Sequence, residues 1–263
     1  MKARIALAER EVAIDIARPV SLARRLDFHG PQPRHFGAPA ASARPFETGE
    51  FKGAVAGGAS CNCEVISLIP HCNGTHTECV GHLTRERLDA SSVAPLGLLP
   101  ALLVTVDAEP AALAHEGSDP APQSGDRLIT RRALEGAWPV QLPFAPRALI
   151  VRTWPQREQA APAYLTRQAA TLLVERGITD LVIDLPSIDR EHDEGRLTAH
   201  RIFFGLPPAA TALTAAARPS ATITELAEVP DELADGPYLL ELQLPALGGD
   251  AVPSRPLLYA VST

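Results

Sequence analysis

The segment from residue 71 to residue 82 is denser in metal-binding and proton-transferring groups than the rest of the sequence. It contains three of the eight histidines and two of the four cysteines, together with one carboxylate, Glu78. Imidazole, thiolate and carboxylate groups are the protein ligands that zinc and similar divalent ions accept. Gly74 and Thr75 lie between them, where a tight backbone path is needed to direct two imidazoles to one point. The composition therefore indicates a metal site rather than a solvated surface.

The residues from Gly74 to His82 resemble the His-x-Gly-Thr-His-x-Asp-x-Pro-x-His signature of the cyclase family, and their spacing fits without a gap. That family includes bacterial kynurenine formamidases and isatin hydrolases, which are metal-dependent amide hydrolases. Two positions inside the signature differ, because Glu78 stands where the family has Asp and Val80 stands where it has Pro.

The start of the signature is shifted by one residue. The first family histidine falls on Cys72, and His71 precedes it. A loop that is one residue longer would still deliver His71, whereas the Cys72 thiolate would also suit zinc. Both residues therefore stay candidates for the first ligand.

Two later segments also resemble the family. Residues 181–189 resemble its Gly-Ile-Asp-x-x-Ser-x-Asp stretch, and residues 222–226 resemble the segment whose glutamate is a metal ligand. His200 stands where the family has a metal-binding histidine. The resemblance implies one or two divalent ions, zinc or manganese, and His82 as the catalytic proton donor and acceptor. The implied metal ligands are His71, His76, Glu78, His200 and Glu225.

A divalent ion held by these groups would suit hydrolysis. It polarises a carbonyl and lowers the pKa of bound water from ~16 toward ~7, and a histidine with an ordinary pKa near ~6.5 can exchange protons at neutral pH. Together with the resemblance, this chemistry implies a metal-dependent hydrolase, and the resemblance implies that it acts on a small-molecule amide of the arylformamide or cyclic amide type. A lactonase, esterase or dehydratase on the same metal site is the alternative, as is a non-catalytic zinc-binding protein.

Several of these residues also have plainer interpretations. His76, Glu78 and His82 could form a structural hydrogen-bond cluster instead. Asp184 and Asp189 are typical of turns or of groups that orient metal ligands. A structural zinc site would need four cysteines that lack the paired Cys-x-x-Cys spacing of common zinc folds. They are Cys61, Cys63, Cys72 and Cys79.

The composition of the 263-residue chain is that of an ordinary globular protein, with 46% hydrophobic and 21% charged residues. A net charge of −7 argues against a nucleic-acid binder and against docking on an anionic membrane. Residues 1–20 carry charges throughout and lack the apolar region of a signal peptide, and no stretch approaches the ~20 apolar residues of a membrane helix. We therefore expect a cytoplasmic protein with reduced cysteines and a small-molecule substrate.

The apolar patterns predict many strands and few helices. A helix is expected at about 162–176, with Pro162 in its first turn and Gly177 just past its end. A short helix is expected at 130–136, with Thr130 as N-cap. The predicted strands are 12–16, 61–69, 101–107, 147–152, 180–185, 238–244 and 256–261.

These patterns alone give a mixed α/β fold that is rich in strands. The resemblance implies more, namely a swivelling β/β/α cyclase-like fold in a single domain, 1–263, that forms a homodimer. Residues 18–59 are rich in proline and irregular, so we expect them to form an arm or loop packed on this domain.

Overall fold

The computed structural model describes residues 1–7, 10–154 and 162–262. The chain divides into two compact units: the first comprises Met1–Arg24 with Thr75–Thr263, and the second comprises Arg25–Gly74. Within the described residues, no helix combines the length and the apolar character needed to cross a bilayer.

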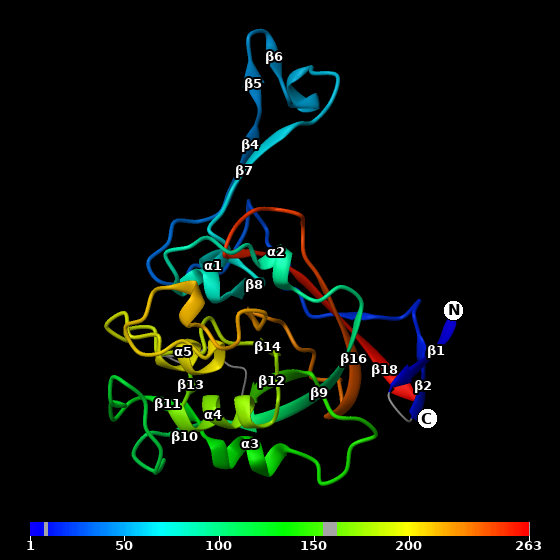
Figure 1. The fold of residues 1–263 in the computed structure, drawn as a ribbon. Helices are drawn as coiled ribbons and strands as arrows, with labels where there is room; N and C mark the ends of the chain where they lie inside the picture. The colour runs from blue at the N-terminus through cyan, green and yellow to red at the C-terminus, as the bar shows by residue number, and fades with distance from the viewer. Residues whose placement is uncertain (8–9, 155–161, 263) are drawn as a thin grey trace. The chain divides into compact units, whose positions relative to one another are not determined.

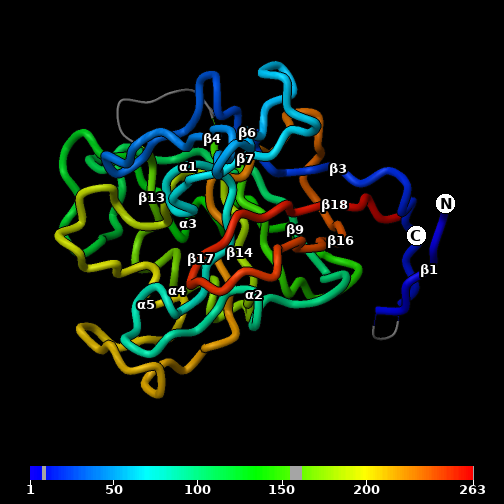
Figure 2. The backbone as a smooth tube through the Cα atoms, turned by 90° about the horizontal axis from the view of Figure 1, so that it is seen from above, coloured from blue at the N-terminus to red at the C-terminus, as the bar shows by residue number. Residues whose placement is uncertain are grey.

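A large mixed sheet forms the centre of the first unit (Figure 1). Its middle strands β9, β12, β14 and β15 run parallel, and antiparallel strands flank them on both sides. The N-terminal strand β1 and the end of β18 lie at the same end of the sheet (Figure 2). In order across the sheet, the strands are β1 (Lys2–Leu7), β2 (Arg10–Asp15), β18 (Arg255–Ser262), β16 (Gly236–Gln243), β9 (Leu98–Asp107), β12 (Ala148–Trp154), β14 (Asp180–Ile183), β15 (Thr222–Glu225), β8 (His76–Cys79) and β17 (Ala251–Pro253), and β3 (Val20–Ser21) also pairs with β18.

Successive side chains of the middle strands point to opposite faces and so supply two apolar cores. On β12, Leu149 and Val151 pack into the core that the helices cover, whereas Ile150 packs into the core shared with β16 and β18. Phe203 is one of the helix residues that fill the first core. Burial on both faces explains why the parallel strands read as continuous apolar runs. The covering helices are α3 (Arg131–Ala137), α4 (Arg167–Glu175) and α5 (Thr198–Phe204).

Smaller elements complete the first unit. A three-stranded sheet lies in the order β10-β11-β13, and short helical turns connect several strands. These elements are β10 (Glu109–Pro110), β11 (Arg127–Ile129), β13 (Tyr164–Leu165), α2 (Ala90–Val93), η2 (Val80–Leu83) and η3 (Leu213–Ala215). The architecture confirms the predicted mixed α/β, strand-rich fold.

The second unit consists of two short strand pairs and helical turns. β4 pairs with β7 and β5 pairs with β6, all antiparallel. The expected strand 61–69 is confined to β7, because Cys61 and Cys63 precede it and are exposed. The arm packed on the domain, predicted for 18–59, stays a prediction. The elements are β4 (Ser42–Pro45), β5 (Glu47–Thr48), β6 (Phe51–Lys52), η1 (Val55–Gly57), β7 (Glu64–Ser67) and α1 (Pro70–Asn73).

The helix expected at 162–176 begins later than the sequence indicated. Thr166 is its N-cap, with a side chain that accepts a hydrogen bond from the Ala169 amide, and the residues before it form β13. A side-chain cap fixes a helix start more strongly than proline near the start does. Gly177 follows the helix with φ of +74°, as a left-handed C-terminal residue should. Thr130 caps α3 in the predicted way.

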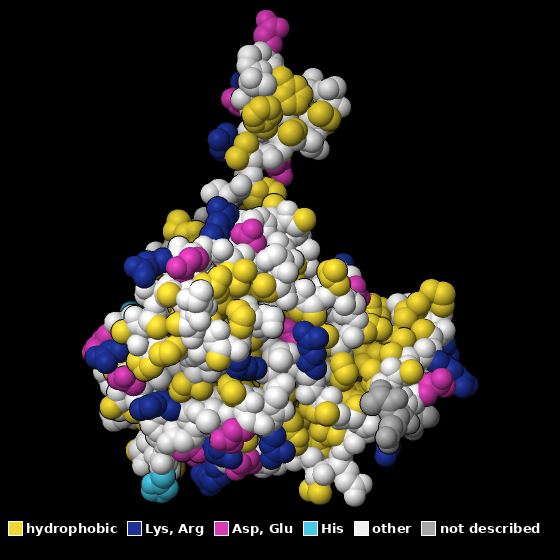
Figure 3. Space-filling view, in the orientation of Figure 1, with side chains coloured by type: hydrophobic (Ala, Val, Ile, Leu, Met, Phe, Trp, Pro, Cys, Tyr) yellow, Lys and Arg dark blue, Asp and Glu magenta, His cyan; other side chains and the backbone are white. Residues whose placement is uncertain are grey.

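Charged side chains of both signs are interspersed on the face drawn in Figure 3, which shows no broad area of one charge.

Candidate metal centre

Strand β8 supplies two of the candidate ligands from one face. It lies between β15 and β17, and all four of its residues are buried. Because side chains alternate along a strand, His76 and Glu78 share a face, and Thr77 and Cys79 share the other. The alternation separates the polar pair that can bind a metal from the pair that packs behind it.

The face of β8 that points away from the candidate ligands fixes the strand register. Thr77 lies directly opposite Thr224 of β15, and their hydroxyl groups are 2.7 Å apart. The Thr75 hydroxyl donates to the Leu226 carbonyl at 2.6 Å and accepts from the Arg24 amide at 2.9 Å. These hydrogen bonds hold β8 and β15 in the register that places their candidate ligands side by side.

Glu225 reaches the same point from the neighbouring strand. It is the register partner of His76, and its Oε2 lies 3.5 Å from His76 Nε2. Its Oε1 accepts a hydrogen bond from the Ile188 amide at 2.9 Å. One ligand atom from each of His76, Glu78 and Glu225 can be chosen so that all three lie within 4.8 Å of one another.

Helix α5 brings His200 to this group. Asp189 accepts hydrogen bonds from the amides of Ala199 and His200 at the start of the helix, and from His200 Nδ1 at 2.7 Å. The ring is thereby oriented with Nε2 3.0 Å from Glu78 Oε1 and 3.5 Å from Glu225 Oε1. A carboxylate that fixes the far nitrogen of a histidine is the usual support of a metal ligand.

The electrostatics of the group follow from its burial, since His200 and both glutamates are at most 3% exposed. Burial lowers the pKa of His200, but the charge of Glu78 and the bonds to Asp189 outweigh it and raise that pKa well above its ordinary value. Burial raises the pKa of Glu225, but hydrogen bonds from His200 and His76 outweigh it and lower that pKa. Two buried carboxylates thus depend on a nearby positive charge.

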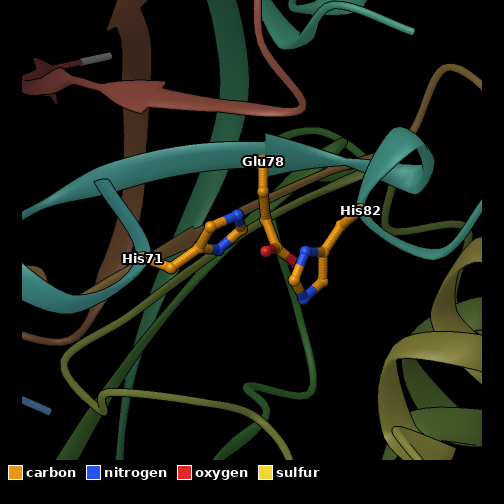
Figure 4. Close-up of side chains that lie close together, drawn as sticks. All are labelled: His71, Glu78 and His82. Atoms are coloured by element: carbon orange, nitrogen blue, oxygen red, sulfur yellow. The ribbon is translucent and has the colours of Figure 1, made fainter. Parts of the chain in front are cut away.

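His82 lies beside the group and is more accessible. It belongs to η2, its side chain is 28% exposed, and its Nδ1 lies 3.2 Å from Asp250 Oδ2. Its ring centroid is 6.0 Å from that of His200. Glu78 and His82 extend toward the same space in Figure 4. Gly81 permits this turn, because a Cβ there would collide with the Leu88 carbonyl.

The cysteines do not form a metal site among the described residues. Groups of ligand-type side chains close enough to hold an ion contain no cysteine. Burial raises the pKa of Cys79 to about 11, and its thiol donates to the Leu88 carbonyl at 3.3 Å. Burial also raises the pKa of Cys72, which disfavours its thiolate. The four-cysteine zinc site is therefore not observed.

The structure brings together four of the five predicted ligands, His76, Glu78, His200 and Glu225. His71 belongs to α1 of the second unit, so its assignment stays a prediction. The sequence did not assign a role to Asp250. It did indicate Asp189 as a turn or orienting residue, but the Ile188 amide that contacts Glu225 carries no sequence signal.

The comparisons with known proteins identify similar folds and one family. No curated protein matches the sequence. A predicted metal-dependent hydrolase from Bacillus stearothermophilus has 17% identity and a TM-score of 0.57, covering 92% of this chain and 98% of that chain.

Two isatin hydrolases have similar folds. Isatin hydrolase A from Labrenzia aggregata, bound to benzyl benzoate, has 16% identity and a TM-score of 0.58 over 93% of this chain and 94% of its own. Isatin hydrolase A from Ralstonia solanacearum has 14% identity and a TM-score of 0.59 over 92% of each chain.

The family model described as "Putative cyclase" matches residues 14–190, which is more than half of the chain. The signature around His76 and the fold that carries it therefore place this chain in the cyclase family.

Proposed function

We propose that this protein is a metal-dependent hydrolase that cleaves a C–N amide bond of a small molecule. One observation carries the proposal: two buried carboxylates and two buried imidazoles from three elements, β8, β15 and α5, converge on one point. Burying two carboxylates side by side is costly unless a cation accompanies them. The similar structures described as metal-dependent hydrolase and isatin hydrolase support the proposal.

The donor set fits a divalent ion. His76, Glu78, His200 and Glu225 would hold it, because imidazole nitrogen and carboxylate oxygen suit both zinc and manganese. Such an ion, when bound, polarises a carbonyl and lowers the pKa of a bound water molecule toward ~7. Two carboxylates provide enough negative charge for one ion or for two.

His82 would move the protons. It lies next to the buried group yet stays accessible, and Asp250 contacts its Nδ1. In amide cleavage its imidazole would accept a proton from the attacking water and then deliver one to the leaving nitrogen.

The test begins with elemental analysis of protein purified without chelator or added metal. Rates on an arylformamide, a cyclic amide, a lactone and an ester are then measured before and after complete metal removal. We expect about one or two equivalents of zinc or manganese, amide hydrolysis that stops on removal, and recovery on adding the metal back. Glu225→Gln should lose metal and activity, whereas Glu228→Gln, an exposed acid three residues later, should keep both.

The outcomes separate the alternatives. Faster turnover of the lactone or ester than of the amides would replace the amide assignment with a lactonase or esterase. Bound zinc without any turnover would favour a non-catalytic zinc-binding protein, and hydrolysis that survives complete stripping would exclude the metal chemistry. The homodimer and the cytoplasmic location stay predictions.

A further inference from the structure

A separate cavity of about 510 Å³ lies against α5 in the first unit. Its volume is within the range of small-molecule sites. The walls come from the start of α4, from α5 and from the loops around residues 119, 195 and 207. None of the candidate ligands of the metal centre lines it, so the cavity needs an explanation of its own.

Three arginines and one acid line this cavity. Arg196 contacts Asp119 at 3.5 Å and also Glu194, outside the lining, at 3.3 Å, so its charge is offset. No ion pair among the described residues includes Arg167 or Arg201. In a chain with a net charge of −7, two uncompensated guanidinium groups in one cavity favour an anionic occupant.

The Arg201 guanidinium is held in place by backbone carbonyls. Its Nε donates to the Arg196 carbonyl at 3.1 Å, and its Nη1 donates to the carbonyls of Pro207 and Ala210 at 3.1 and 2.8 Å. These acceptors fix the side chain without neutralising its charge. Arg167, by contrast, is exposed and can adjust to an occupant.

The remaining lining is mostly apolar. Ile202, Leu206, Pro207 and Pro208 supply hydrocarbon surface, while the Thr198 hydroxyl is engaged with the Asp119 carbonyl at 2.9 Å. An occupant that complements this lining has one anionic end and an apolar body. We propose that this cavity binds a small carboxylate with an apolar body, whose carboxylate pairs with Arg167 and Arg201.

The experiment uses 4-phenylbutanoate as the probe and isothermal titration calorimetry on the protein as purified, and the comparison with Arg167→Gln separates this cavity from the metal centre. We expect a Kd below about 1 mM for the unmodified protein, and Arg167→Gln should raise this Kd about tenfold or more. Arg255→Gln, which removes an exposed arginine on β18 outside the cavity, should leave the Kd unchanged. The neutral analogue 4-phenylbutanamide should bind at least about tenfold more weakly.

Equal binding to the Arg167→Gln and unmodified proteins would overturn the proposal, as would equal binding of the amide. Absence of carboxylate binding at millimolar concentration would also overturn it. Displacement of the probe by an equal concentration of inorganic phosphate would show a general anion site and contradict the need for an apolar body. Because only the binding that depends on Arg167 is counted, the result does not depend on the proposed hydrolase activity.

Discussion

At the scale of single residues, the orientation of His200 decides whether the candidate metal centre is assembled. Asp189 binds both the start of α5 and the ring nitrogen that faces away from the glutamates. The same carboxylate therefore places the helix and turns the imidazole, so that Nε2 faces Glu78 and Glu225. Such supporting contacts are worth about 10–100-fold in metal affinity.

We expect Asp189→Asn to weaken metal binding by about 10–100-fold, because the neutral amide cannot supply the charge that strengthens His200 Nε2 as an electron-pair donor to the metal. Competition with a chelator of known affinity measures the change. Glu194→Gln, an exposed acid of the same loop, is the control and should bind normally. Unaltered affinity in Asp189→Asn would remove Asp189 from the support of the site.

A second substitution separates proton transfer from metal binding. His82→Ala should lower kcat by about 10²–10⁴-fold, as loss of a general acid–base does, while the metal content stays close to that of the unmodified protein. Steady-state kinetics with elemental analysis of the same sample measures both. A variant with ordinary turnover would exclude His82 from the chemistry.

The sequence could indicate these residues because their types and spacing are local. The pattern from His76 to His82 is read directly from consecutive residues, and His200 and Glu225 were found through motifs. Asp250 could not be found in this way, because its contact with His82 joins positions 168 residues apart. A backbone donor such as the Ile188 amide is present at every residue and therefore leaves no mark in a sequence.

At the scale of elements, strand β8 is the piece that sets the geometry. It is only four residues long and is held between β15 and β17. Its sequence, His-Thr-Glu-Cys, is polar, so a pattern of alternating apolar residues does not predict this strand. Strand β15 is similarly short and polar. The longer strands and the caps of α3 were predictable, since Val, Ile and Leu runs and a Thr N-cap act locally. The predicted start of α4 was too early, because the side-chain cap of Thr166 sets the start of the helix and Pro162 does not.

The Thr77–Thr224 pair offers a test of register on β8. Thr77→Val should destabilise the fold by about 1–3 kcal/mol, because it leaves the buried Thr224 hydroxyl without its partner. The double variant Thr77→Val with Thr224→Val should recover much of this loss, since neither position then carries an unsatisfied hydroxyl. Urea unfolding of all four proteins completes the cycle, and strictly additive losses would show that the pair is not coupled.

At the scale of the whole molecule, the parallel strands place polar groups at their carboxyl ends, and one of them links stability to pH. Asp184 follows β14 and accepts hydrogen bonds from the Thr153 amide at 2.8 Å and hydroxyl at 2.9 Å, at the end of β12. Burial raises the pKa of Asp184 from 3.8 to about 6, against the lowering effect of these bonds. The folded state therefore holds its proton over a pH range in which the unfolded chain has lost it.

The sign of the resulting pH dependence follows from linkage. Below pH 3.8 the side chain is protonated in both states, and its stabilising contribution is complete. That contribution declines as the pH rises through the folded value near 6, by about 3 kcal/mol in total for this shift.

Other groups titrate in the same range, so the unmodified protein must be compared with Asp184→Asn. The free energy of unfolding of both proteins, metal-free, is measured at several pH values between 4 and 7. Asn keeps an acceptor for Thr153 but does not ionise, so the unmodified protein should lose stability relative to the variant as the pH rises. A difference in unfolding free energy that stays constant with pH would mean that Asp184 ionises in the folded protein at its ordinary pKa. A difference that changes in the opposite direction would mean that the hydrogen bonds from Thr153 lower the pKa of Asp184 by more than burial raises it.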